Sequence, residues 1–129
     1  MIYLDTSVAL AHLLSEDRRP PDSIWSETLV SSRLLECETW TRIHAKGLAR
    51  SHSETVRSLL ARVAMLELAP RVLARALEPF PIPVRTLDAL HLASMEFLRA
   101  QSQPVTLAAY DIRLLEAAAR MGIPSLALP

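Results

Sequence analysis

The sequence predicts an α/β fold: a three-layer α/β/α sandwich around a central, mostly parallel, five-stranded sheet. Short apolar runs alternate along the chain with longer segments of helical character, which is the order that parallel βαβ units produce. The apolar runs are hydrophobic at nearly every position, as expected when helices cover both faces of a sheet. A length of 129 residues is typical of one domain, so we expect a single domain over residues 1–129.

Five apolar runs are predicted as the strands of this sheet. Each is only a few residues long, and parallel neighbours can be joined only by a crossover segment, which is usually a helix. In chain order the predicted strands are Ile2–Asp5, Leu29–Ser31, Leu66–Leu68, Val105–Ala108 and Ser125–Leu128.

The segments between these runs are predicted as helices. The first can be capped by Thr6 or Ser7, the last ends at Gly122, and the cluster of Pro79, Pro81 and Pro83 stops another. The predicted helices are Ser7–Ser15, a short helix from about Ser23, Arg33 to about Gly47, a helix from Ser51 or Ser53 to about Met65, Arg71–Glu78, Thr86 to about Ala100, and Ile112–Met121.

Composition excludes several classes of function. The net charge is zero, which is unlike proteins that hold nucleic acid by bulk electrostatic attraction. Gly47 and Gly122 are the only glycines, so neither a P-loop nor a G-x-G-x-x-G turn can be formed. A phosphodiester, if it binds here, must therefore bind without a glycine cradle.

The sequence also suits a reducing compartment. Cys37 is the only cysteine, so no internal disulfide can form. No apolar stretch approaches the roughly 20 residues that span a bilayer, and the first residues do not resemble a signal peptide. We therefore expect a cytoplasmic protein that does not associate with a membrane.

Four acidic residues combine an apolar setting with a strand end or the first turns of a helix. Asp5 ends the first predicted strand and Asp111 follows the fourth, whereas Glu38 and Asp88 lie early in predicted helices. The carboxyl ends of parallel strands share one edge of a sheet, and the helices that follow them begin there. The four carboxylates can therefore converge, provided that the proline-rich segment brings the start of the Asp88 helix to this edge.

Each of these residues also has a structural interpretation. Asp5 and Asp111 could cap helices, and Asp88 could interact with a helix dipole. Glu38 points toward the core side of its helix, where an unpaired glutamate is costly. Glu36 is an alternative to Glu38, but it lies about 200° around the helix, so one site cannot easily use both.

Converging carboxylates would require a cation. Like charges at about 4–6 Å repel each other, and a set of three or four stays ionised only when it is neutralised. Oxygen ligands favour a hard cation, Mg²⁺ or Mn²⁺, which can activate water for attack on a phosphodiester. Zinc is disfavoured because Cys37 is alone and the four histidines lie far apart in the sequence.

Four stretches resemble the PIN-domain family, and within it the VapC-like toxins of type II toxin–antitoxin systems. They are IYLDTS, VSSRLLECETW, RTLDALHLAS and AAYDIRLLEAAARMGIP, and together they extend along the whole chain. The resemblance implies a metal-dependent endoribonuclease that cleaves RNA, forms homodimers and is inhibited by a small antitoxin.

The resemblance also implies roles for particular residues. The family's acidic quartet falls on Asp5, Glu38, Asp88 and Asp111, with Thr6 in support. Glu38 is preferred to Glu36 because the family acid lies six residues beyond the serine that corresponds to Ser32. Ala109 departs from the family, which often has a threonine or serine two residues before the fourth aspartate.

Further candidates surround this quartet. His91 lies one turn after Asp88 and could orient a carboxylate or bind phosphate, although we favour the interpretation that it is a packed, hydrogen-bonded histidine on a mostly buried helix. Four arginines are candidate RNA-phosphate contacts because they are expected near the sheet edge that carries the predicted site: Arg18, Arg19, Arg42 and Arg85.

Two other functions are compatible with an aspartate at the end of the first strand. A phosphoacceptor protein also places an aspartate after its first strand, but Lys46 is the only lysine, and Ser7 stands where a dehalogenase-like enzyme needs a second aspartate. The stronger alternative is a catalytically silent PIN-like module that binds RNA or a protein.

Overall fold

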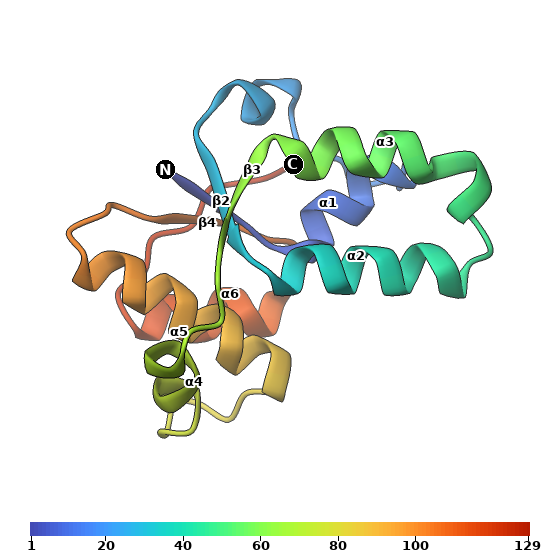
Figure 1. Cartoon of the computed structure of the whole chain (residues 1–129). Helices are drawn as coiled ribbons and strands as arrows, with labels where there is room; N and C mark the ends of the chain where they lie inside the picture. Colours follow the sequence, from blue (N-terminus) through green and yellow to red (C-terminus); the bar gives the residue numbers. More distant parts are fainter.

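The computed structural model describes residues 1–129 and contains one parallel sheet flanked by helices on both faces (Figure 1). The four strands lie in the order β3-β2-β1-β4, and every neighbouring pair is parallel. Their bounds are β1 Ile2–Leu4, β2 Leu29–Ser32, β3 Val63–Leu66 and β4 Thr106–Ala108. The prediction of a three-layer α/β/α sandwich with a parallel sheet is confirmed.

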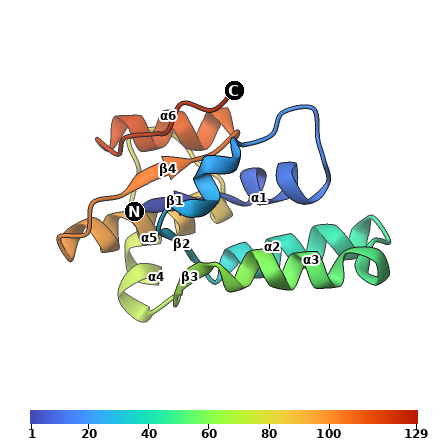
Figure 2. The same ribbon diagram turned by 90° about the horizontal axis from the view of Figure 1, so that it is seen from above.

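Six α-helices and one short 3₁₀-helix connect the strands. Figure 2 shows α1, α2 and α3 on one face of the sheet and α4, α5 and α6 on the other. Their bounds are α1 Thr6–Leu13, the 3₁₀-helix Asp22–Ser26, α2 Leu34–Ala45, α3 Ala49–Ala61, α4 Pro70–Ala76, α5 Thr86–Ala100 and α6 Ile112–Arg120. None of them is both long and apolar enough to cross a bilayer.

The strands divide the interior into two hydrophobic clusters, one on each face. Successive side chains of a strand point to opposite faces, so Ile2 and Leu4 join the cluster under α1, α2 and α3. Tyr3, between them, joins the cluster under α5 and α6. The polar atom of Tyr3 is therefore carried into the core beneath α5.

The predicted fifth strand is wrong. The segment from Ser125 forms only a single parallel bridge, between Ser125 and Leu107, so the sheet has four strands. Leu107 donates to the carbonyl of Pro124 and accepts from the amide of Leu126. Proline has no N–H to donate, so the ladder cannot continue in the direction of Pro124.

The predicted third strand is displaced in sequence. It was expected at Leu66–Leu68, after a helix reaching about Met65, but α3 ends at Ala61 and β3 covers Val63–Leu66. Residues 63–66 pair in register with Leu29–Ser32 of β2, and this pairing buries Val63. Tertiary pairing here overrides the helical preference of alanine, methionine and leucine.

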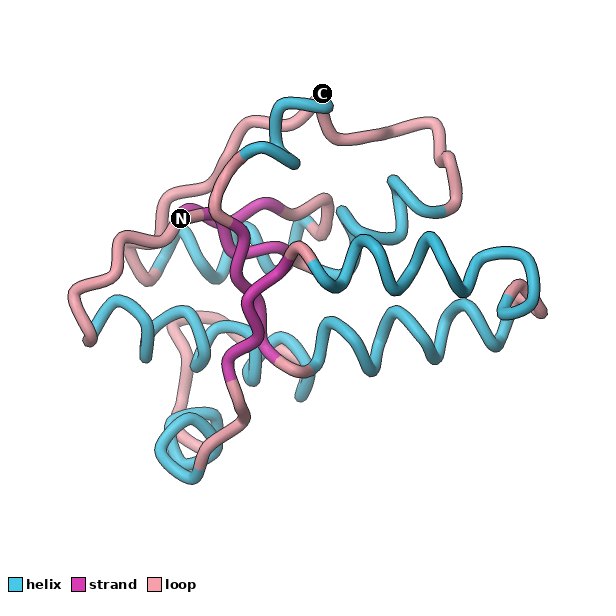
Figure 3. Tube along the Cα trace, turned by 45° about the horizontal axis from the view of Figure 1, so that its top comes forward, coloured by secondary structure: helices cyan, strands magenta, loops and turns pink.

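The strand ends determine where a site can form. β1 leads directly into α1, β2 leads into α2, and β4 leads into α6 after three residues. Figure 3 shows the strands as the central magenta band, with helices leaving from their ends and α2 and α3 lying side by side. Because the strands are parallel, the starts of α1, α2 and α6 lie along the same edge of the sheet.

Candidate active site

The four predicted acidic residues lie after this edge or at the start of a helix. Asp5 follows β1 directly and is the N-cap of α1, and Asp111 is the N-cap of α6. Glu38 lies in the second turn of α2, and Asp88 lies in the first turn of α5. Asp5 and Asp111 therefore cap helices, as the structural interpretation expects.

Asp5 is a buried carboxylate with one oxygen held by the protein. Only 6% of its surface is exposed. Its Oδ2 accepts hydrogen bonds from the amide of Ser7 at 3.2 Å and from the hydroxyl of Ser7 at 2.5 Å. Its Oδ1 has no hydrogen bond and lies 3.9 Å from Nε2 of His91. The Ser7 hydroxyl also accepts from the amide of Tyr110 at 2.9 Å, which ties the start of α1 to the end of β4.

Glu38 is also held through a single oxygen. Its Oε1 accepts from the hydroxyl of Thr6 at 2.9 Å and lies 2.7 Å from Nε2 of His91. Its Oε2 has no hydrogen bond, and 23% of the side chain is exposed. The side chain of Glu38 is therefore partly exposed and keeps one oxygen without a protein partner.

Asp111 repeats this pattern, and Asp88 does not. Asp111 Oδ1 accepts from the amides of Arg113 at 3.0 Å and Leu114 at 3.3 Å, and its Oδ2 has no partner. The half-buried Asp88 receives no hydrogen bond from any other side chain.

Electrostatic interactions link the four carboxylates in a chain. The pKa of Asp5 is raised, first by burial and also by the charge of Glu38, although His91 and the Ser7 hydrogen bonds oppose this. The pKa of Asp88 is raised by burial, then by Asp111, and also by Asp5. None of the four forms an ion pair with an arginine or lysine, and His91 is the basic side chain that lies within 4 Å of Asp5 and Glu38.

His91 lies inside the acidic group rather than beside Asp88. Its ring is 1% exposed, Nδ1 lies 2.7 Å from the hydroxyl of Tyr3, and Nε2 faces Glu38. Burial opposes the charged form, but Tyr3, the Glu38 hydrogen bond and the charges of Asp5 and Glu38 outweigh it, so the pKa of His91 is raised. The sequence places His91 within reach of Asp88, but its hydrogen bond is with Glu38 because this face of α5 packs against β1.

The carboxylate oxygens of this site are suitable ligands for a hard cation, although they do not lie close enough together to coordinate one ion. No group of three or more His, Cys, Asp or Glu side chains is close enough to hold a metal ion. Repulsion between like charges favours such spacing. Nevertheless, Asp5, Glu38 and Asp111 each keep one carboxylate oxygen without a hydrogen bond. Carboxylate oxygens of this kind are what Mg²⁺ and Mn²⁺ prefer.

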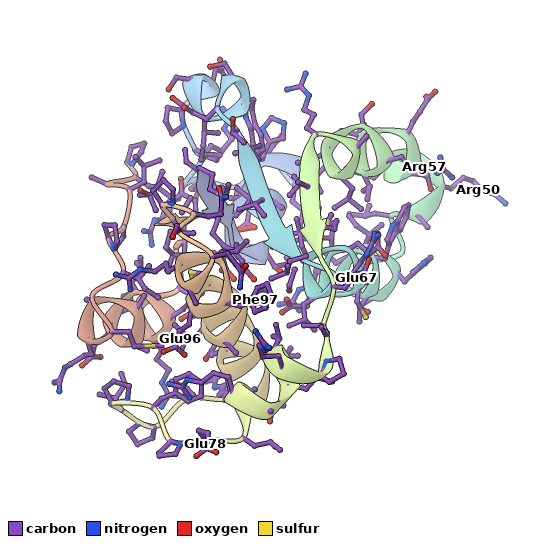
Figure 4. All side chains as sticks on the ribbon, turned by 60° about the vertical axis from the view of Figure 1, so that its left-hand side comes forward. Arg50, Arg57, Glu67, Glu78, Glu96 and Phe97 are labelled. Carbon is purple, nitrogen blue, oxygen red and sulfur yellow. The ribbon has the colours of Figure 1, made fainter.

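Glu36 lies in a different environment from Glu38. Its side chain is 45% exposed and pairs with Arg33 at 3.5 Å. Arg33 in turn pairs at 2.8 Å with Glu67, which Figure 4 shows just beyond the end of β3. Arg57 of α3, labelled in the same figure, lines this face together with Glu36. Glu38, and not Glu36, contacts Thr6 and His91.

Three of the four candidate arginines lie around the acidic residues. The guanidinium of Arg18 covers the ring of Tyr110, 4.6 Å from its centroid. Arg42 lines a cavity of about 340 Å³ together with Thr6 and Glu38. Arg85 is the exposed residue that precedes α5. Arg19 instead lies near His12, whose pKa is lowered first by burial and also by the charge of Arg19.

Sequence reasoning missed two residues of this arrangement. Ser7 has a local signal, since a serine two residues after an N-cap aspartate can bond it. Tyr3 has none, because a tyrosine in a buried strand is indistinguishable from an ordinary core residue until its neighbour in space is known.

Comparisons with known proteins agree with this fold. The family model of the PIN domain matches residues 2–120. The chain is 32% identical to ribonuclease VapC46 of Mycobacterium tuberculosis over 129 residues, which cover 98% of this chain and 96% of that protein. The crystal structure of VapC20 of the same organism, described as a sarcin-ricin loop cleaving toxin, superimposes with a TM-score of 0.65 at 18% identity, covering 91% of this chain and 95% of the other. The chain therefore belongs to the PIN-domain family, and within it is VapC-like.

Proposed function

We propose that this protein is a Mg²⁺- or Mn²⁺-dependent endoribonuclease that acts as the toxin of a toxin–antitoxin pair. The observation that carries the proposal is the state of the three carboxylates Asp5, Glu38 and Asp111. Each has one oxygen held by protein donors and one oxygen without a partner, and no arginine or lysine neutralises them. The similarity to a ribonuclease over nearly the whole chain supports the same conclusion.

In this proposal the four acidic residues Asp5, Glu38, Asp88 and Asp111 hold one or two divalent ions. A bound ion would polarise the scissile phosphate and lower the pKa of a water molecule for attack on phosphorus. The protein's part is to orient the ligands. Ser7 and the first amides of α6 fix one oxygen of Asp5 and Asp111, and Thr6 does the same for Glu38.

RNA would approach from the open side of these carboxylates. The net charge of the chain is zero, so local positive groups must offset the repulsion between RNA phosphates and the acidic site. Arg18, Arg42 and Arg85 are exposed, make no ion pair and stand near the site, which suits phosphate contacts. Arg19 is a weaker candidate because it lies near His12.

Protein partners are also part of the proposal. Leu87 and Ile112 are 45% and 74% exposed, and each adjoins an acidic residue of the site, Asp88 or Asp111. Exposed apolar side chains at this place would suit an antitoxin that covers the site, and a second copy of the chain would be expected to cover other apolar surface. We further propose that the protein acts in the cytoplasm.

The test is cleavage of structured RNA by the purified chain with Mg²⁺ or Mn²⁺, with EDTA as the metal-free control. We expect cleavage that EDTA abolishes and that Asp5→Asn reduces at least about 100-fold, since even outer partners of metal ligands cost about 10–100-fold. Asp22→Asn, which alters an exposed acid of the 3₁₀-helix, is the matched control and should cleave normally. Equal cleavage by wild type and Asp5→Asn would contradict the assignment.

The alternative is a catalytically silent PIN-like module that binds RNA or a protein. One observation favours it: the acidic side chains do not form a closed set of metal ligands. RNA binding without cleavage under any divalent ion, and without binding of Mn²⁺, would support this alternative over the nuclease.

A further inference from the structure

A line of three buried or half-buried side chains connects the core to the candidate site. Tyr3 in β1 and His91 in α5 are 0% and 1% exposed, and their polar atoms are 2.7 Å apart. His91 Nε2 then lies 2.7 Å from Oε1 of Glu38, at the open edge. Each link joins residues distant in sequence, so the line forms only when α5, β1 and α2 pack together.

The surroundings of His91 show which nitrogen carries a proton. Nε2 faces two carboxylate oxygens, Oε1 of Glu38 and, at 3.9 Å, Oδ1 of Asp5. A carboxylate can only accept, so Nε2 must donate. Nδ1 faces the Tyr3 hydroxyl, which can donate to it and thereby hold the neutral ring in the Nε2–H tautomer. Nε2 carries its proton in the imidazolium as well, so this contact does not depend on the charge of the ring.

The contact is selective for one oxygen of Glu38. Thr6 and His91 both bond Oε1, from α1 and α5 respectively, and neither touches Oε2. Two donors from different helices restrict the rotation of a glutamate side chain that is otherwise partly exposed. The consequence is that Oε2 is left without a partner and with a fixed orientation.

We propose that His91, itself oriented by Tyr3, is a positioning residue that fixes Glu38 through Oε1 and thereby presents Oε2 as a ligand for a divalent cation. This inference rests on the proposed metal-dependent function and assigns the oxygen that would be used. His91 and Tyr3 are not ligands themselves. They act through Glu38, as outer partners of metal ligands do in other sites.

The chain offers a matched pair of variants for the test. Tyr3→Phe removes the hydroxyl that orients His91, whereas Tyr110→Phe removes a buried hydroxyl that has no hydrogen-bond partner. The two changes are chemically identical. His91→Leu removes the donor to Glu38, and His91→Gln keeps an amide donor at the end of the side chain.

The readout is the affinity of the RNA-free protein for Mn²⁺, measured by calorimetry. We expect His91→Leu to weaken Mn²⁺ binding about 10–100-fold and Tyr3→Phe to weaken it less. His91→Gln should recover most of the loss, and Tyr110→Phe should bind as wild type does. Nitrogen-15 NMR of the histidine ring should show a proton on Nε2 in wild type, as the Nε2–H tautomer or as the doubly protonated ring, and a neutral ring protonated on Nδ1 would contradict the contact with Glu38.

The possible failures are distinguishable. Unchanged Mn²⁺ affinity in Tyr3→Phe and in folded His91→Leu would overturn the positioning role and leave the nuclease proposal intact. Equal weakening in Tyr3→Phe and Tyr110→Phe would also overturn it, because the effect would then be unspecific. Absence of Mn²⁺ binding and of cleavage in wild type would overturn the proposed function, and the positioning role with it.

Discussion

Two faces of helix α2 each carry a glutamate, and the two glutamates differ in their partners and in their surroundings. On one face, Glu36 pairs with the exposed Arg33 within a group of surface charges that includes Glu67. On the other, Glu38 accepts from Thr6 and His91 and lies close enough to Asp5 to raise the pKa of that residue. Between the two faces runs a buried seam that includes Leu35 and Ile43.

The difference shows that helix geometry determines how far apart the two glutamates lie, whereas tertiary packing determines the partners of each. Helical geometry separates two residues at positions i and i+2 by about 200°, so they cannot share a site. Packing then gives one face a cationic partner and the other face a set of acids and uncharged donors. A glutamate paired with arginine is satisfied, whereas one that keeps a free oxygen among other carboxylates is available to a cation.

The largest effect is expected from the seam that separates the two faces. Leu35 is fully buried in the cluster under α1, α2 and α3, so Leu35→Ala should lower the free energy of unfolding by about 2–5 kcal/mol. Leu34→Ala, at a half-buried neighbour, should cost clearly less. Urea denaturation of both variants measures this difference. Equal losses would mean that the seam is not the part of α2 that anchors the helix.

The second effect is a difference in activity between the two glutamates. Glu38→Gln should reduce RNA cleavage at least about 100-fold, because it removes a charge from the proposed cation site. Glu36→Gln should stay within about two-fold of wild type, since surface ion pairs contribute little. Initial rates under identical Mg²⁺ concentrations measure both. If Glu36→Gln lost more activity than Glu38→Gln, Glu36 and not Glu38 would be the residue of the cation site.

A third effect is a dependence of stability on pH. Because the pKa of Asp5 is raised in the folded protein, the native state binds this proton more tightly than the unfolded state does. Ionised Asp5 therefore destabilises the fold, and the penalty disappears as the pH falls from the raised pKa toward 3.8, the ordinary value. Asp5→Asn lacks this penalty, so the stability of the variant minus that of wild type should be greatest at high pH and should decline as the pH falls toward 4. Urea titrations across this range test the sign, and a constant or growing difference toward low pH would contradict it.

The smallest effect is expected at the exposed ion pair of Glu36. The side chain of its partner Arg33 is 45% exposed, so screening by solvent and salt should leave Glu36→Gln with no measurable change in melting temperature. Differential scanning calorimetry at low and moderate salt is the check. A clear destabilisation would show that the surface face of α2 contributes to the fold as well.

Much of the fold follows from local patterns. The helix Thr86–Ala100 has the predicted bounds, and the strands at Ile2, Leu29 and Val105 were predicted to within a residue or so. The displaced third strand and the missing fifth strand have a common reason. Residues 63–66 suit helix and strand alike, and Ser125–Leu128 suits a strand, so pairing with β2 or β4 decides the outcome.

Some features of the candidate site could likewise be predicted from local patterns, and others could not. Asp5, Glu38, Asp88 and Asp111 can be named from the chain because strand ends and helix starts are local features, although their joint role as ligands stays a prediction. The partner of His91 could not be named. A histidine one turn from Asp88 suggests a contact along the helix, yet its ring turns inward to Glu38 and Tyr3.

The amino-acid order thus suffices for the alternation of strands and helices, for the parallel sheet, and for the acidic residues at its edge, because these depend on periodicity and on caps a few residues long. It does not reveal which carboxylate oxygen is held and which stays open. Those assignments depend on contacts such as His91–Glu38 and Tyr3–His91, between residues 53 and 88 positions apart. Such contacts exist only after three elements have packed, since a side chain that must choose between partners is oriented by whatever surrounds it in space.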